Sequence, residues 1–172
     1  MQTLTRPIIN PVQSLFGRFR RVGIAGYALA LLVVISTGAL AQSSGQRRPF
    51  KCIEAGTYDG GGSEGTGQAT HLGKFIVTVR IEFVSFDSVT GLYQTHNFAT
   101  YQAANGELLF SESTTELYVY EPQWVQVGHE TFTGGTGRFE YATGESIWVA
   151  DVFPTSETLG TWSAINEGFL TY

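Results

Sequence analysis

Hydrophobic and polar side chains alternate along much of the chain after residue 73. The alternation is clearest over residues 74–84, where every second position from Phe75 to Phe83 carries Phe, Val or Ile. Successive side chains of a β-strand point to opposite faces, so a period of two predicts a strand with one apolar face. Residues 74–84 are therefore the most clearly marked strand of the chain.

Further runs rich in Tyr, Thr, Val and Phe follow, with turn signals between them. Asn105 and Gly106 separate two of these runs, and an Asn-Gly pair favours a tight hairpin because both turn positions need positive φ. Residues 138–142 read as a short strand or a turn. No sustained helical period appears after residue 42, so the sequence predicts an all-β, antiparallel up-and-down barrel whose closure removes exposed sheet edges. The other predicted strands are residues 92–103, 107–121, 124–133, 147–153 and 161–172.

The first 41 residues have the composition of a secretory signal peptide. Four arginines and no acid precede residue 22, an uncharged apolar run covers residues 24–41, and the run ends on Ala39-Leu40-Ala41. This combination predicts a signal-peptide helix that is cleaved near Ala41. The expected location is therefore secreted, periplasmic or in the cell envelope. The alternative is an uncleaved anchor, which is the only membrane contact that we predict.

Residues 42–65 are expected to be a flexible leader and a glycine-rich loop. Five glycines and two acids fall between Thr57 and Gly67, a composition typical of a mobile loop. The predicted organisation is thus a signal peptide at 1–41, the leader and loop at 42–65, and one barrel domain at 66–172.

The net negative charge after residue 41 argues against nucleic acid as a partner. Fifteen acidic side chains stand against six basic ones, a net charge of −9, and such a surface repels the phosphates of nucleic acids. Cys52 is the only cysteine, so no internal disulfide forms; it is either an inert buried thiol or a partner for another chain or a small thiol. The sequence has no Cys/His cluster and no cofactor fingerprint, so we expect no metal and no cofactor.

A glycine-rich segment in the second half of the chain carries a family resemblance. Residues 132–144, Phe-Thr-Gly-Gly-Thr-Gly-Arg-Phe-Glu-Tyr-Ala-Thr-Gly, resemble the signature of the allene oxide cyclase barrel and of the dirigent proteins. Residues 69–75 and 103–110 look like segments of exported bacterial proteins of this group, and the resemblance covers Thr66 to Tyr172. It implies a calycin-like barrel of eight strands that often forms trimers. In the plant enzymes of this group, the barrel steers a cyclisation or a radical coupling inside an apolar lumen.

The glycine-rich segment itself has a structural interpretation. Glycines at a barrel corner allow positive φ and close backbone approach, after which Phe139 re-enters the core. Arg138 is either architectural or paired with a buried acid. The segment therefore supports a fold more than a reaction. The residues assigned to this structural motif are Gly134, Gly135, Gly137, Arg138, Phe139 and Gly144.

The strand predicted over residues 107–121 carries two candidate catalytic acids. Glu112 and Glu116 share a parity with Phe110 and Tyr118, so one face of the strand is both acidic and aromatic. If this face points into the barrel, burial raises the carboxyl pKa and makes either acid a usable general acid or base, and the two aromatic residues line a ligand. If it points outward, these are solvated acids or part of a subunit contact.

The following strand offers a third catalytic candidate. His129 shares a face with Val127, so it either lines the lumen beside this ligand-lining valine or is a hydrogen-bonded core histidine. Trp124, Trp148 and Trp162 are expected to fill core or rim positions, although aromatic side chains also favour ligand contact.

Three functions fit these observations, and the filling of the lumen distinguishes them. The first is an exported barrel that binds an apolar small molecule, because about eight strands leave room for one small ligand. The second is an enzyme, an isomerase or cyclase that holds a reactive chain in a productive shape. The third is a non-catalytic structural or interaction protein with a packed lumen. A void with one desolvated carboxyl favours the enzyme, and a void without a titratable group favours the binder.

Overall fold

A computed structural model describes residues 45–120, 122–156 and 158–172. The predicted signal-peptide helix, and the uncleaved anchor that is its alternative, fall on residues 1–41 and lie outside the described residues. Within the part of the chain that is described, no helix is long and apolar enough to cross a membrane.

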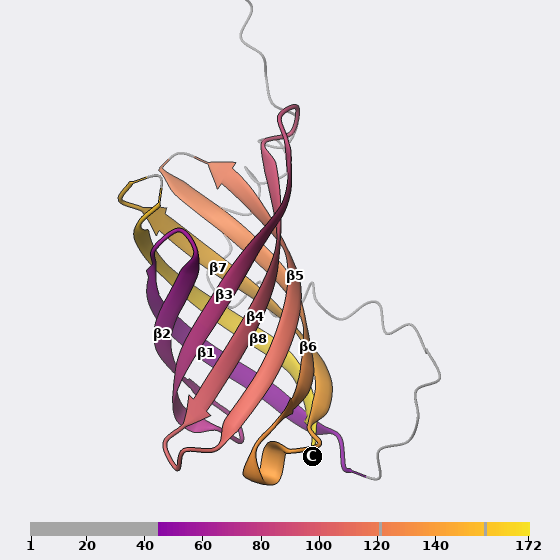
Figure 1. The fold of residues 1–172 in the computed structure, drawn as a ribbon. Helices are drawn as coiled ribbons and strands as arrows, with labels where there is room; N and C mark the ends of the chain where they lie inside the picture. The colour runs from indigo at the N-terminus through magenta and orange to yellow at the C-terminus, as the bar shows by residue number, and fades with distance from the viewer. Residues whose placement is uncertain (1–44, 121, 157) are drawn as a thin grey trace, which may run out of the picture. The chain divides into compact units, whose positions relative to one another are not determined.

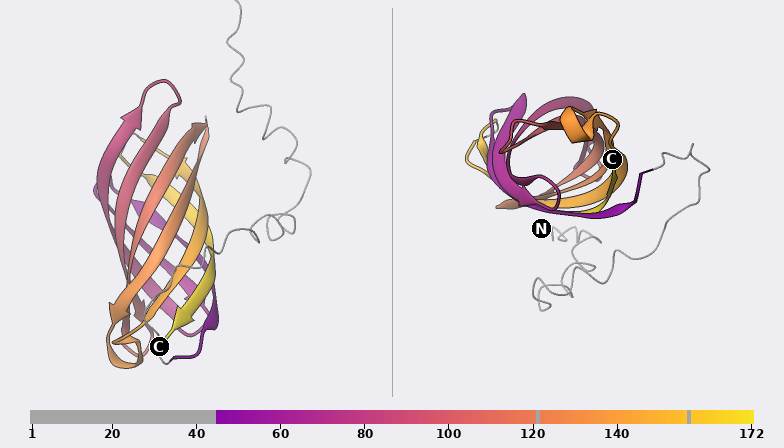
Figure 2. Two further views of the ribbon diagram at one scale, coloured as in Figure 1. Left: turned by 90° about the vertical axis from the view of Figure 1, so that its right-hand side faces the viewer. Right: turned by 90° about the horizontal axis from the view of Figure 1, so that it is seen from below.

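Eight antiparallel strands form a closed barrel in which every strand pairs with its neighbours in sequence (Figure 1). The ring closes where β8 pairs with β1, from Arg48 opposite Leu170 to Tyr58 opposite Gly160, and the right-hand view of Figure 2 looks into this ring from one end. The predicted all-β, up-and-down barrel is thereby confirmed. The strands are β1 (Arg48–Tyr58), β2 (Gly62–Ala69), β3 (Gly73–Asp87), β4 (Leu92–Ala103), β5 (Leu108–Tyr120), β6 (Gln123–Gly135), β7 (Thr143–Pro154) and β8 (Gly160–Thr171).

β1 and β2 occupy the segment for which the sequence predicts a leader and a mobile loop. The glycines of β2 give the physical reason for the difference. A Cβ on Gly65 would lie 2.7 Å from the Trp162 ring, and one on Gly67 would lie 2.5 Å from the Phe75 ring. Both glycines are therefore strand residues that leave room for large side chains of other strands. The barrel consequently begins at residue 48 and not at residue 66.

The remaining six strands lie where the alternation of the sequence predicts them, with ends that differ by a few residues. The largest change is in β7, which begins at Thr143 and not at residue 147. Of the two interpretations of residues 138–142, the turn is the one present, because Gly137–Phe139 forms the 3-10 turn η3 between β6 and β7.

The glycine-rich segment forms the corner between β6 and β7. Gly134, Gly137 and Gly144 have φ angles of 121°, 60° and 147°, which side chains with a Cβ rarely adopt. A Cβ on Gly135 would overlap the backbone carbonyl of Leu108 on the neighbouring strand. The corner thus depends on glycine for its backbone angles and for its close approach to β5.

Arg138 connects this corner to two other turns at the same end of the barrel. Its Nε atom lies 3.2 Å from a carboxyl oxygen of Glu107, which precedes β5. A second guanidinium nitrogen donates a 2.7 Å hydrogen bond to the carbonyl of His71, between β2 and β3. Of its two predicted roles, Arg138 therefore has the architectural one, and its acidic partner lies at the barrel end.

The end of the barrel that carries η3 is filled by large apolar side chains. Two of its rings, Phe50 and Phe132, pack edge to face with centroids 4.8 Å apart. These side chains close one end of the barrel, and the β1–β2, β3–β4, β5–β6 and β7–β8 turns lie at the other end. The largest fully buried apolar side chains of this cluster are Phe50, Val77, Leu109, Phe132, Phe139 and Leu170.

Candidate functional site

A cavity forms in the barrel because small side chains face inward at its middle. The strand register sets Glu54 of β1 opposite Ala164 of β8, and Ala164 opposite Ala150 of β7. Gln126 of β6 is the next residue in this row. Residues directly opposite on neighbouring strands share a face of the sheet. Two alanines side by side therefore leave unfilled the space that larger residues occupy at the closed end.

The cavity has a volume of about 170 Å³ and is lined by residues of all eight strands. An engineered apolar cavity of about 150 Å³ in another protein holds one benzene molecule, so the space here suits a ligand with one ring. Most of its wall is apolar. Besides the alanines and the aromatic residues, the apolar lining residues are Val77, Val79, Ile81, Leu117 and Val152.

All three tryptophans of the chain line this cavity. Trp148 packs directly on Gly128, where a Cβ would overlap the indole. The Trp162 Nε1 donates a 3.3 Å hydrogen bond to a backbone carbonyl of β1. The Trp124 Nε1 and the Tyr58 hydroxyl are buried and make no hydrogen bond with the described residues. The wall therefore combines fixed aromatic rings with polar groups whose bonding capacity is unused.

Glu130 supplies a buried carboxylate at the base of the cavity. The Tyr101 and Ser111 hydroxyls donate hydrogen bonds to its Oε1 at 2.8 and 2.5 Å. The Ser146 hydroxyl and the Asn166 amide donate to its Oε2 at 2.6 and 2.7 Å. Four donors from four different strands thus hold one carboxylate, which is the arrangement that a buried charge requires.

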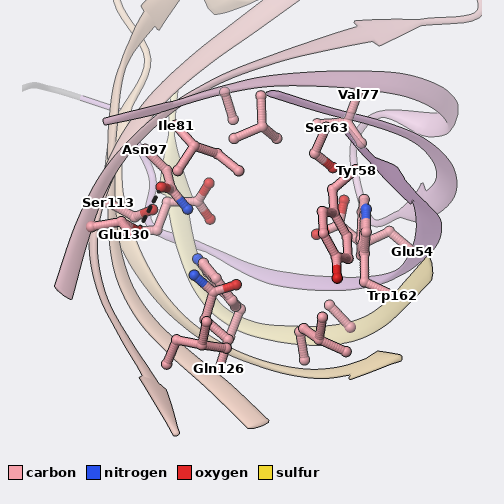
Figure 3. A pocket seen from close by; sticks show the side chains of 18 of the residues that line it. Glu54, Tyr58, Ser63, Val77, Ile81, Asn97, Ser113, Gln126, Glu130 and Trp162 are labelled. Atoms are coloured by element: carbon pink, nitrogen blue, oxygen red, sulfur yellow. Dashed lines mark hydrogen bonds between the residues drawn. The ribbon is translucent and has the colours of Figure 1, made fainter. Parts of the chain in front are cut away.

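Glu54 is a second buried acid, but it has no such partners. It is 8% exposed, and its Oε2 makes no hydrogen bond with the residues described. It lies beside Tyr58 and Trp162 on one side of the cavity, whereas Glu130 lies on the other (Figure 3). Burial, followed by the negative charge of Glu130, raises the pKa of Glu54 to about 8. Glu54 is therefore a neutral, proton-carrying carboxyl at pH 7.

Cys52 lies on the same inward face of β1 as Glu54. It is buried, and burial together with the charges of Glu54 and Glu130 raises the pKa of its thiol far above the usual range. A thiol of this kind is unreactive, which agrees with the inert-thiol interpretation of the sequence. Among residues 45–120, 122–156 and 158–172, no group of His, Cys, Asp and Glu side chains has the arrangement of a metal site.

The three candidate catalytic residues of the sequence analysis lie on the outer face of the barrel. The side chain of Glu112 is 49% exposed, and its carboxyl lies 3.6 Å from the His96 imidazole. Glu116 is exposed and accepts a 2.6 Å hydrogen bond from the Tyr118 hydroxyl. His129 is exposed as well. The acidic and aromatic face of β5 therefore points outward, and none of the three candidate residues lines the cavity.

The three predicted ligand-lining residues share this outward orientation. Phe110, Tyr118 and Val127 are absent from the cavity wall. The inward face of β5 starts at Leu109 and continues through serine and threonine residues. Because side chains alternate across a strand, the acidic and aromatic parity of β5 faces outward.

Neither Glu54 nor Glu130 is a candidate in the sequence analysis, because each lies beside a feature that pointed to another interpretation. Glu54 falls in the segment predicted to be a leader, and Glu130 is adjacent to His129, on the opposite face of β6. The available signal was Trp124, which shares its parity with Glu130 and also lines the cavity. Assigning the face of β6 that carries Trp124 to the barrel interior would have identified Glu130 as an inward-facing acid.

Comparison with known proteins provides no relative for this chain. No protein-family model, curated protein or solved structure matches it. The resemblance to allene oxide cyclases and dirigent proteins therefore stays a prediction, and the site is interpreted from its own geometry.

Proposed function

We propose that the barrel binds a small molecule with an apolar body in the cavity between the tryptophans. The observation that carries this proposal is the open space beside Ala150 and Ala164, where a packed structural barrel needs larger side chains. Burying one aromatic ring removes roughly 150 Å² of surface from water. At about 25 cal/mol per Å², this contributes about 4 kcal/mol, which offsets part of the ligand's loss of translational and rotational freedom before any polar contact is counted.

Calorimetric titration of the barrel with benzyl alcohol tests this proposal. Ala164→Leu adds three carbons to the cavity wall and should weaken binding about tenfold or more, because the ring no longer fits. Ala55→Leu is the matched control, since Ala55 is an exposed residue of β1 outside the cavity. Equal binding by both variants would place the ligand elsewhere. Absence of binding by the unmodified barrel to every single-ring compound would refute the proposal.

A second candidate function, an isomerase or cyclase, is favoured by the desolvated carboxyl in the cavity, which is the feature that the sequence analysis uses to distinguish an enzyme from a binder. Glu54 is a desolvated carboxyl that carries a proton at neutral pH and lines the cavity. Such a group can donate its proton to an oxygen of a bound molecule and recover it afterwards, while the aromatic wall holds the molecule folded. Incubation with a metabolite extract should then give products of unchanged mass and altered chromatographic retention. Glu54→Gln should abolish them, and Glu112→Gln should not.

We also propose, from the sequence pattern, that the barrel is exported and belongs to the allene oxide cyclase and dirigent group. The apolar run that ends on Ala39-Leu40-Ala41 and the segment at residues 132–144 support these two statements. Native mass spectrometry of the exported fraction tests them together. A chain beginning at Gln42 supports the predicted cleavage and a trimer supports the family, whereas a protein found only in the cytoplasm contradicts export.

A further inference from the structure

The ionisable side chains that the described residues contribute to the cavity are all acids. Among the described residues, its wall contains two carboxyl side chains, Glu54 and Glu130, and no Lys, Arg or His. The carboxylate of Glu130 already has four donors, so it offers the ligand a fixed negative field and no free acceptor. An anionic ligand would meet this field in a setting of low dielectric constant, where repulsion between like charges is strong.

Glu54 differs from Glu130 in having an unused oxygen. Its Oε2 is buried and makes no hydrogen bond with a described residue. A buried carboxyl oxygen without a hydrogen-bond partner costs free energy, so a ligand that brings an N–H to this group, once the group has given up its proton, gains the bond and removes that cost. A charged donor gains more than a neutral one, because its attraction to both carboxyls adds to the hydrogen bond.

The aromatic part of the wall also suits a positive charge. The indoles of Trp124, Trp148 and Trp162 and the phenol of Tyr58 surround the same space as the acids. The face of an aromatic ring attracts a cation, and clusters of such rings with a nearby acid are a known means of binding ammonium groups. The acids and the aromatic rings thus both favour a positively charged ligand.

We infer that the cavity selects organic ammonium compounds: small molecules with an apolar body of about one ring and a protonated amine that is held by Glu54. This inference rests on the proposed binding function and adds the charge of the ligand to it. The net charge of −9 after residue 41 acts in the same direction, because a negative field raises the local concentration of cations.

Binding of an ammonium group is coupled to a proton. Because the pKa of Glu54 is raised to about 8, its carboxyl must ionise when the amine binds. At pH 7 binding therefore releases about one proton, and the affinity rises about tenfold from pH 6 to pH 7 and about fivefold from pH 7 to pH 8. The titratable groups that face Glu54 are Cys52 and Tyr58 on β1, Tyr101 on β4 and Glu130 on β6. The first three have raised pKa values and stay neutral in this range.

Three probes of similar size and different charge test the inference: benzylamine, benzyl alcohol and benzoate. Calorimetry at pH 8 should give the order amine, alcohol, benzoate, with the amine at least about tenfold tighter than the alcohol. Titrations at pH 7 in two buffers of different ionisation enthalpy should report about one proton released by the amine and none by the alcohol. In Glu54→Gln the ratio of amine to alcohol affinity should fall below about three, whereas Glu112→Gln should keep the ratio of the unmodified barrel.

The possible outcomes separate failure of the cation selectivity from failure of the proposed small-molecule binding. If the alcohol binds as tightly as the amine, or the amine releases no proton, the cavity binds small molecules but does not select cations. If benzoate binds most tightly, the assigned charge is wrong. If none of the three binds, the inference fails together with the proposed function. Proton release is measured on the unmodified barrel, so the test does not depend on the folding of a variant.

Discussion

Replacing Glu54 by Gln should change how the stability of the barrel depends on pH. In the unfolded chain this carboxyl ionises with a pKa near 4.5, whereas in the barrel burial and the charge of Glu130 raise its pKa to about 8. Because the folded state holds the proton more tightly, the free energy of unfolding decreases as pH rises between these two values. The decrease is about 1.4 kcal/mol per pH unit, or roughly 4 kcal/mol between pH 5 and pH 8. Glutamine cannot ionise, so Glu54→Gln lacks this contribution.

Urea unfolding at several pH values, followed by tryptophan fluorescence, measures the effect. The difference in unfolding free energy between Glu54→Gln and the unmodified barrel should move in favour of the variant by roughly 4 kcal/mol from pH 5 to pH 8. Glu112→Gln removes an exposed carboxyl on the outer face and should stay within about 0.5 kcal/mol of the unmodified barrel. A difference for Glu54→Gln that is constant with pH would refute the buried, protonated state of this acid.

Three further predictions concern the packing around the cavity. Gly65→Ala sets a methyl group 2.7 Å from the Trp162 ring, so we expect a loss of about 1–3 kcal/mol in urea unfolding and a weaker affinity for benzyl alcohol. Glu130→Gln replaces an acceptor for four donors by an amide and should cost about 2–4 kcal/mol, and unchanged stability would contradict the hydrogen-bond network. The buried Cys52 thiol should react with a thiol reagent only in denaturant, and rapid labelling of the native barrel would show that it is accessible.

The strands that the sequence predicts are those with regular alternation of apolar and polar residues. β3 is the clearest case, and the Asn105-Gly106 turn between β4 and β5 follows from the backbone angles that this pair favours. β2 has no such pattern, because its inward residues Gly65 and Gly67 are small where rings from other strands fill the space. Their role depends on residues far away in sequence, so composition alone predicts a loop there.

The site was harder to predict because the barrel interior is partly polar. In β5 the aromatic face looks like the buried one, yet the inward side chains near the cavity include Ser111, Ser113 and Thr115. Ser111 faces inward as a donor to Glu130, which lies on β6. A rule that places apolar residues inside and polar residues outside therefore selects the wrong face of β5. Only the pairing of strands shows which acids meet in the lumen.

The tryptophans report directly on whether the cavity binds a small molecule. The chain has three tryptophans, and all of them line the cavity. A nitrogen-15 NMR spectrum of the barrel labelled at tryptophan therefore contains three indole signals, each reporting on the same space. If the cavity binds benzylamine or benzyl alcohol, addition of that compound shifts all three signals saturably with one common Kd, and Ala164→Leu reduces these shifts. Indole signals that stay in place up to millimolar concentrations of both compounds would contradict it.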